Sequence, residues 1–131
     1  MERMKEVINT KLAPGAIGPY SQGTKWKDLI FTSGQIPLDP KTGDLVEGDI
    51  EVQARRTLEN LKAVIEASGS SITNVLKTTC YITDMNHFQK FNSVYQGYFR
   101  EGVPARSCIA VVELPKGALC EVEAIAVIKE L

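Results

Sequence analysis

The sequence predicts an α+β fold in the order β-β-α-β-α-β-β, with two helices on one face of a sheet. Two segments carry apolar residues at the spacing of a helix, and the segments beside them alternate with the period of two that is typical of strands. No repeat, low-complexity tract or linker interrupts the 131 residues. Because a chain of this length fits one domain, we expect residues 1–131 to form a single domain.

Two strands and a long loop are predicted in the first third of the chain. Lys5–Thr10 can form a short first strand, and residues 28–36, DLIFTSGQI, form a second β-rich run. Between them, residues 12–23, LAPGAIGPYSQG, contain three glycines and two prolines, which is the composition of a loop. Residues 37–45, PLDPKTGDL, are predicted to form turns.

The first helix is predicted between an N-cap at Asp49 and a glycine just beyond its end, Gly69. Its buried positions recur at helical spacing and are Ala54, Leu58, Leu61 and Ile65. The second helix is expected to begin at a cap, either Asp84 or Asn86, and to end before Gly102. Its buried stripe would be Phe88, Phe91, Tyr95 and either Tyr98 or Phe99.

A third strand is predicted between the helices, at residues 75–83, VLKTTCYIT. Strict alternation would place Leu76, Thr78, Cys80 and Ile82 on one face, and Val75, Lys77, Thr79 and Tyr81 on the other.

The last two strands are predicted at residues 105–114 and 119–130. The short segment PKGA joins them, so we expect an antiparallel hairpin. The sheet face away from the helices would carry Tyr81, Ile125 and Val127. An apolar face without a cover is a reason to expect oligomerisation.

Composition excludes several classes of protein. The net charge of −1 at pH 7 argues against a standing attraction to nucleic acid or acidic membranes. No stretch reaches the roughly 18 to 20 apolar residues of a membrane span, and the N-terminus lacks the apolar core of a secretory signal. Three cysteines without a C-x-x-C motif are most simply free thiols of an intracellular, cytoplasmic protein.

The motifs of common cofactor sites are also missing. A single histidine, His87, excludes a multi-histidine metal site within one chain, so no metal is expected. Neither G-x-x-x-x-G-K-[ST] nor a strand-linked G-x-G-x-x-G is present, so nucleotide cofactors are not indicated.

Residues 103–111, VPARSCIAV, place Arg106 and Cys108 two positions apart, so both side chains face the same side of a strand. Arginine can favour a thiolate, but a nucleophilic cysteine usually needs a histidine base, and His87 falls on the predicted second helix. Cys108 is therefore interpreted as a packing residue. Arg106 is either a surface charge or an anion clamp, because its planar fork matches a carboxylate.

Two glutamates, Glu121 and Glu123, share a face of the last predicted strand. If their environments differ, one glutamate can act as an acid and the other as a base. Otherwise they form a pair at the solvated end of the strand. The loop before residue 24 offers Tyr20 amid rigid backbone, and Ser33 precedes Gly34, where the backbone can approach a ligand closely. None of these features is specific when taken alone.

Five motifs in register resemble one known family. They are IGPYSQG, FTSGQIP, KTTCYITDM, PARSC and EVEAIAV, and the resemblance runs from about Pro14 to Ile128. Together they resemble the reactive-intermediate deaminase family (RidA, formerly YjgF), the 2-iminobutanoate/2-iminopropanoate deaminases.

The resemblance implies a chorismate-mutase-like fold with a mixed sheet, and a homotrimer whose sites lie in clefts between subunits. It implies hydrolysis of 2-imino acids to 2-oxo acids and ammonia. The substrates are small 2-imino carboxylic acids produced by dehydratases that depend on pyridoxal phosphate, without a necessary complex between the enzymes. It implies no cofactor or metal. From the net charge and the lack of a long apolar stretch, neither nucleic acid nor a membrane is expected as a partner.

Carried over residue by residue, the carboxylate-binding arginine is Arg106, and the acidic residue near the attacking water is Glu121. The resemblance assigns the remaining substrate contacts to Tyr20, Ser33, Gly34, Asn92 and Cys108, with Cys108 lining the pocket. Cys120 stands where the family usually has an aliphatic residue. It should point away from Glu121, so we expect a change in packing there.

Two other functions remain open at this point. One is a trimer that binds a small ligand or regulates without catalysis, against which the presence of Arg106 argues. The other is an endoribonuclease or translation inhibitor. The near-zero net charge and the lack of a basic, aromatic-rich stripe argue against that function.

Overall fold

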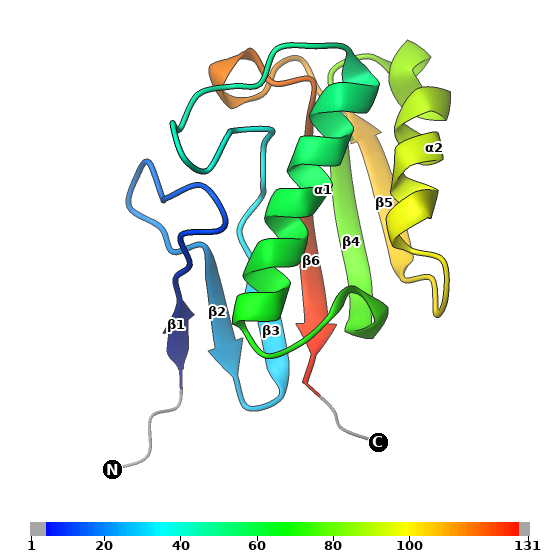
Figure 1. Cartoon of the computed structure of the whole chain (residues 1–131). Helices are drawn as coiled ribbons and strands as arrows, with labels where there is room; N and C mark the ends of the chain where they lie inside the picture. Colours follow the sequence, from blue (N-terminus) through cyan, green and yellow to red (C-terminus); the bar gives the residue numbers. More distant parts are fainter. Residues whose placement is uncertain (1–4, 129–131) are drawn as a thin grey trace.

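The computed structural model describes residues 5–128, and its central feature is a six-stranded sheet with two helices lying across one face (Figure 1). The strands are β1 Glu6–Ile8, β2 Gly23–Trp26, β3 Leu29–Thr32, β4 Val75–Ile82, β5 Ala105–Ala110 and β6 Cys120–Val127, and the helices are α1 Ile50–Ala67 and α2 Phe88–Tyr98. The sheet order is β1-β2-β3-β6-β4-β5. The predicted α+β fold with a mixed sheet is confirmed, since β4 and β5 are parallel and the other pairs are antiparallel.

The prediction missed one strand, so the observed order is β-β-β-α-β-α-β-β. The additional strand is β2, which pairs with β3 through a register in which Trp26 faces Leu29. The turn between them consists of Lys27 and Asp28, and Lys27 has a positive φ of 54°. Two-residue hairpin turns usually carry glycine or asparagine at such a position, so the sequence lacks the usual signal.

The predicted hairpin between the last two strands is wrong. β4 lies between β5 and β6 and pairs with both, parallel to β5 and antiparallel to β6. A parallel pair needs a crossover connection, and α2 supplies it between β4 and β5. The segment from β5 to β6 instead runs through a 3₁₀ turn at Pro115–Gly117 and returns to the far side of β4. The last two residues of the predicted final strand lie outside the described residues.

The predicted limits of α1 are confirmed by its caps. The carboxylate of Asp49 accepts a hydrogen bond from the backbone N–H of Val52 at 3.1 Å, and Gly69 follows the helix with a positive φ of 93°. The four predicted buried positions of α1 are all inaccessible to solvent. Burying a leucine or isoleucine side chain stabilises a fold by about 1.5–3 kcal/mol, so this stripe contributes strongly to helix packing.

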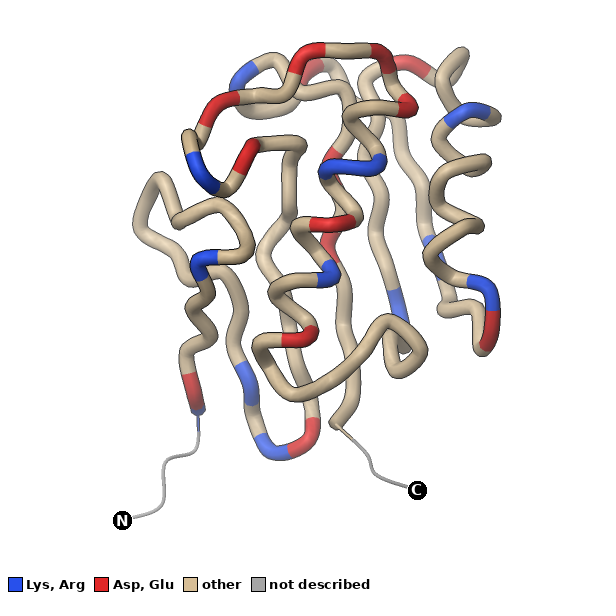
Figure 2. Tube along the Cα trace, in the orientation of Figure 1, with Lys and Arg blue, Asp and Glu red and all other residues tan. Residues whose placement is uncertain are grey.

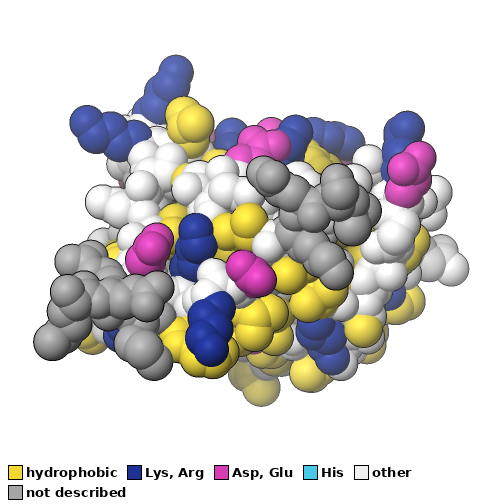
Figure 3. All heavy atoms as spheres, turned by 90° about the horizontal axis from the view of Figure 1, so that it is seen from below, with side chains coloured by type: hydrophobic (Ala, Val, Ile, Leu, Met, Phe, Trp, Pro, Cys, Tyr) yellow, Lys and Arg dark blue, Asp and Glu magenta, His cyan; other side chains and the backbone are white. Residues whose placement is uncertain are grey.

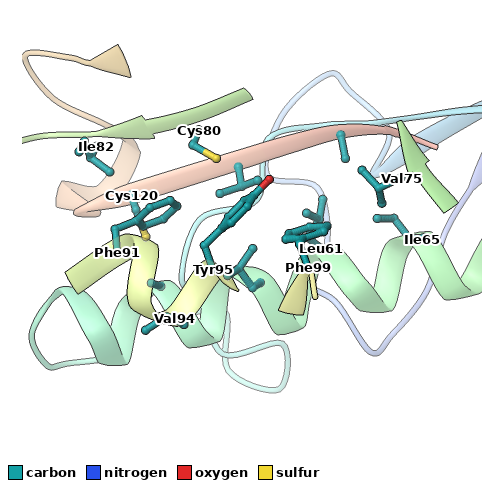
Figure 4. Packing of buried hydrophobic residues seen from close by; sticks show 14 of the residues in the cluster. Leu61, Ile65, Val75, Cys80, Ile82, Phe91, Val94, Tyr95, Phe99 and Cys120 are labelled. Carbon is teal, nitrogen blue, oxygen red and sulfur yellow. The ribbon is translucent and has the colours of Figure 1, made fainter. Parts of the chain in front are cut away.

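The helix α2 follows a single 3₁₀ turn, and Asp84 caps that turn by accepting a hydrogen bond from Asn86 at 2.9 Å. Its buried face includes Phe91, Tyr95 and Phe99, which stack in sequence along the helix (Figure 4). Tyr98 is turned toward α1 instead. There its hydroxyl donates to the carboxylate of Glu59 at 2.6 Å.

The start of β4 departs from strict alternation. Val75 is only 3% exposed and Leu76 is 50% exposed, which is the reverse of the prediction. The register against β6 shifts between Val75 and Lys77, and this irregularity turns the first residues of the strand over. From Thr78 onward the predicted alternation is confirmed, with Thr78, Cys80 and Ile82 buried under the helices.

The sheet face away from the helices is left uncovered by residues 5–128. Phe31 of β3 pairs with Ile125 of β6 on this open face, and Phe31 is 40% exposed. Ile109 of β5 is paired with Tyr81 of β4 on the same side. None of the described helices is long and apolar enough to cross a membrane.

Candidate functional site

Glu121 is the first residue of β6 whose side chain lies on the open face of the sheet, and it lies directly over Gly34. A Cβ built on Gly34 would overlap the carboxylate oxygen of Glu121. The two are held together because Gln35 and Val122 exchange backbone hydrogen bonds of 2.8 and 3.0 Å. This bridge joins the segment after β3 to β6, so the carboxylate can keep this position only while residue 34 is a glycine.

A pocket of about 300 Å³ surrounds the Glu121 carboxylate. It is lined by Ile17, Tyr20, Ser33, Gly34, Ile36, Pro115 and Glu121, and we call it the Glu121 pocket. Four of the residues expected from the family resemblance therefore gather in one place. Most of the remaining lining is aliphatic, which suits a small organic molecule with an apolar side chain.

The loop that carries Tyr20 is held by a residue to which the sequence assigned no role, Gln22. Its side chain is 3% exposed. The amide nitrogen donates to the carbonyls of Thr10, Ala13 and Pro14 at 2.8–3.2 Å, and the amide oxygen accepts from the N–H of Thr10 at 2.7 Å. The only hint in the sequence was an amide inside a loop rich in glycine and proline, where backbone carbonyls need donors.

Ser33 joins the same loop to the floor of the pocket. Its hydroxyl donates to the carbonyl of Ser21 at 2.5 Å, and its backbone N–H donates to the carbonyl of Gln22 at 2.9 Å. The Ser33 hydroxyl proton is therefore already used, which leaves its oxygen as an acceptor. Tyr20 is more exposed, and its hydroxyl accepts from the N–H of Ile17 at 3.2 Å.

The electrostatic environment of Glu121 favours a carboxyl that exchanges protons. Half-burial raises the pKa of Glu121 above its usual range, and the neighbouring charge of Glu123 raises that pKa further. A carboxyl with a raised pKa is suited to general acid–base chemistry near neutral pH.

Arg106 lies in β5 on the face covered by α2. Its Nη1 donates to Asn92 Oδ1 at 2.6 Å, and the guanidinium carbon stands 4.8 Å from the ring centre of Tyr95 and 5.5 Å from that of Phe88. We call these four residues the Arg106 cluster. The Asn92 amide occupies one of the five guanidinium N–H groups, so donors remain for an anion.

Cys108 shares the face of Arg106, as the strand period predicted. Partial burial raises the pKa of the Cys108 thiol, and the nearby charge of Arg106 offsets this shift only in part. The thiol therefore stays protonated at neutral pH, which is unfavourable for a nucleophile. Cys120 packs in the core on the face opposite Glu121, where its sulfur lies 3.5 Å from the Thr57 hydroxyl.

The two groups of residues lie on opposite faces of the sheet. In the register of β4, Thr78 is paired with Arg106 and Tyr81 is paired with Glu121. Thr78 is buried beneath the helices, whereas Tyr81, three residues further, belongs to the open face. Within one chain the sheet therefore separates the Arg106 cluster from the Glu121 pocket.

Metal ligands do not gather near either group. Within residues 5–128, the side chains of histidine, cysteine, aspartate and glutamate form no group of three that could hold a metal ion.

Comparison with known proteins identifies the family. Residues 10–128 match the family model described as endoribonuclease L-PSP. A RutC family protein of Pyrococcus horikoshii is 55% identical over 123 residues, which are 94% of this chain and 98% of that protein. A protein of Salmonella typhimurium named 2-iminobutanoate/2-iminopropanoate deaminase is 48% identical over 127 residues, with 95% and 98% coverage.

Solved structures agree with these sequence matches. The structure of Escherichia coli TdcF with bound serine has a TM-score of 0.89 and 48% identity, covering 93% of this chain and 98% of that one. The structure of yeast Mmf1 has a TM-score of 0.92 at 40% identity, with 95% and 99% coverage. The mixed sheet with two helices is the fold of these proteins, and the chain belongs to the reactive-intermediate deaminase (RidA/YjgF) family, to which the L-PSP family model corresponds.

Proposed function

We propose that this protein hydrolyses small 2-imino acids, such as 2-iminopropanoate and 2-iminobutanoate, to 2-oxo acids and ammonia. The observation that carries the proposal is that the chain holds both an arginine with donors left for an anion, Arg106, and, on the opposite face of the sheet, a carboxyl of raised pKa, Glu121. A relative that is 48% identical over nearly the whole chain bears the name of this activity. The reaction needs no cofactor or metal.

In the proposed mechanism Arg106 binds the substrate carboxylate. Its unoccupied N–H groups form parallel hydrogen bonds to the two carboxylate oxygens. The carbon of a protonated imine is already electrophilic, so no covalent intermediate with the protein is needed. The proposed role of Cys108 is to line the pocket. Tyr20, Ser33, Gly34 and Asn92 are proposed as further contacts to the substrate or to Arg106.

Glu121 is proposed to move the protons. Its carboxylate removes a proton from a water molecule as the water oxygen bonds to the imine carbon, which gives a carbinolamine. The same carboxyl then returns the proton to the amino nitrogen. The C–N bond breaks, ammonia leaves, and loss of the hydroxyl proton completes the 2-oxo acid. One water is consumed for each imine, so the atoms balance.

The separation of Arg106 from Glu121 supports a site completed by a second copy of the chain. We propose a homotrimer in which the Arg106 cluster of one subunit faces the Glu121 pocket of its neighbour. The exposed apolar residues of the open face, which include Phe31 and Ile109, favour such contacts. Subunit exchange would test the assembly. Arg106→Ala and Glu121→Gln proteins, each inactive, should recover part of the activity when mixed, because some interfaces then contain both native residues.

The substrates are unstable products of other enzymes. Dehydratases that use pyridoxal phosphate release enamines and imines from serine and threonine, and these intermediates reach the site by diffusion. The three free cysteines favour a reducing, cytoplasmic location for this chemistry.

A coupled assay tests the proposed activity. The protein is added to a threonine dehydratase reaction, and the decay of the imine is followed together with the release of 2-oxobutanoate. Wild type should accelerate both processes, Arg106→Ala should not, and Arg100→Ala, which removes an exposed arginine at the end of α2, should behave as wild type. An unchanged rate of imine decay with wild-type protein would refute the proposal.

The alternatives predict different results. A binding or regulatory trimer would bind 2-oxobutanoate saturably without accelerating imine decay. An endoribonuclease would cleave RNA, and this cleavage would disappear in a site variant.

The described surface does not favour RNA, because acidic and basic residues are interspersed along the chain and over the end formed by the β2–β3 turn (Figures 2 and 3).

A further inference from the structure

Three side chains on one face of α2 contact the Arg106 guanidinium. Phe88, Asn92 and Tyr95 are spaced four and three residues apart on α2, so their side chains form one ridge. All three contact Arg106, through two ring faces and one hydrogen bond of 2.6 Å. The amide holds one N–H group, whereas the rings attract the positive charge without using any N–H donor.

The ring of Tyr95 is itself fixed from several sides. Its hydroxyl and that of Thr78 form a hydrogen bond of 2.7 Å, and both residues are buried. Phe91 and Phe99 pack on the ring from either side, with ring centres 6.0 and 4.5 Å away (Figure 4). Thr78 is the residue of β4 paired with Arg106. The surface beneath the guanidinium is therefore anchored to the strand next to Arg106.

We propose that Phe88 and Tyr95 are positioning residues that orient the Arg106 guanidinium for carboxylate binding. Orientation matters because two parallel hydrogen bonds to a carboxylate require one plane of the guanidinium. Aromatic rings restrict the orientation of this plane without accepting hydrogen bonds, so the other N–H groups stay available to the substrate. If a glutamate or aspartate stood in place of the rings, its carboxylate would accept hydrogen bonds from these N–H groups and compete with the substrate. This inference rests on the role proposed for Arg106, and its test separates the two.

The first measurement needs no substrate. Protons above an aromatic ring are shifted upfield in the NMR spectrum, so the Arg106 Nε–H signal, assigned by its loss in Arg106→Lys, should lie upfield of that of exposed Arg100. Tyr95→Leu and Phe88→Leu should each move the signal toward the position of Arg100. Tyr95→Phe keeps the ring and should preserve the signal. Tyr98→Leu, which alters an aromatic residue of the same helix whose hydroxyl donates a hydrogen bond to Glu59, is the matched control and should also preserve it.

The second measurement is kinetic. An arginine that binds the substrate and the transition state alike affects KM more than kcat. We expect Tyr95→Leu and Phe88→Leu to raise KM roughly five- to tenfold, within the range of a partly desolvated cation–π contact, with little change in kcat. Tyr95→Phe should restore KM to within about twofold of wild type, although it loses the hydrogen bond to Thr78. A merely structural defect would lower the active fraction, and hence kcat, and leave KM unchanged.

The outcomes separate the two proposals. An Arg106 signal that stays in place in both Tyr95→Leu and Phe88→Leu overturns the positioning role, whatever the enzyme does with imines. A shifted signal together with raised KM supports it. If wild type does not hydrolyse imines, the proposed function fails, while the NMR signal still decides the positioning role. Phe88 is only partly buried, so its variant provides the test if Tyr95→Leu does not fold.

Discussion

Gly34 lies against Glu121 so closely that even a methyl group at residue 34 would meet the carboxylate of residue 121. The contact joins the end of the β3 segment to the start of β6, 87 positions apart along the chain and held by the Gln35–Val122 bridge. The absence of a side chain at residue 34 therefore makes room for the residue that is proposed to move protons.

The first prediction concerns this contact. Gly34→Ala should lower kcat by roughly 10- to 100-fold, because the Glu121 carboxylate must move away and a small misplacement of a catalytic group is costly. Stability should change little, because the carboxylate is half-exposed and free to turn. Steady-state kinetics with imine generated in situ measures the effect, and Gly15→Ala, where a Cβ meets nothing within 4 Å, is the control. Equal activity of both variants would contradict the assigned contact.

The second prediction concerns Cys108. Cys108→Ser should retain substantial activity, within about tenfold of wild type, because a half-buried thiol of raised pKa is not expected to act as a nucleophile. The measurement is kcat/KM in the dehydratase-coupled assay, supported by mass spectrometry for any covalent adduct. An inactive but folded Cys108→Ser protein would restore the covalent mechanism. Cys80→Ser, on the neighbouring strand, shows the cost of altering a buried thiol that is outside the site.

The third prediction concerns pH. Catalysis by the Glu121 carboxylate should fall as pH decreases through its raised pKa, since protonation removes the base. Glu123→Gln removes a neighbouring negative charge, so it should lower the pKa of Glu121 and move the acid limb of the kcat profile to lower pH. Glu113→Gln, which alters an exposed carboxylate, is the control. An acid limb that does not move in Glu123→Gln would contradict this coupling.

The same carboxyl affects stability in the opposite direction. Its pKa is higher in the folded state than in the unfolded chain, so the folded state binds the proton more tightly. The stabilisation is complete below the unfolded pKa and is lost as pH rises through the folded pKa. Glu121→Gln should remove this contribution. Denaturant unfolding of the variant and wild type at several pH values would then show a difference that grows in favour of the variant as pH rises.

The fourth prediction concerns Gln22. Gln22→Ala should reduce the free energy of unfolding by about 2–4 kcal/mol, because three carbonyls and one N–H of a folded loop lose their partner. It should also raise KM, since the loop carries Tyr20. Denaturant unfolding and steady-state kinetics measure the two effects, and exposed Gln96→Ala is the control. Unchanged stability would mean that water replaces the amide without loss.

Several features could be predicted from the sequence because they depend on neighbours along the chain. A helix cap at Asp49, a glycine after the helix at Gly69 and the alternation of β6 are local patterns, and the structure confirms them. The shared face of Arg106 and Cys108 is likewise local, because side chains two positions apart on a strand point the same way. The family resemblance assigned site roles to residues that are far apart in the sequence, such as Tyr20 and Glu121.

Other features were decided only by the tertiary structure, because they depend on which distant segments meet. Pairing between strands has no sequence signal as specific as helical spacing, so β5 was assigned to β6 when it lies beside β4. The turn at Lys27 concealed β2. Only the folded structure places Glu121 over Gly34 and Arg106 against the ring of Tyr95. It also places the Glu121 pocket and the Arg106 cluster on opposite faces of the sheet. The sequence by itself determined the chemical groups available, and long-range packing decided which of them act together.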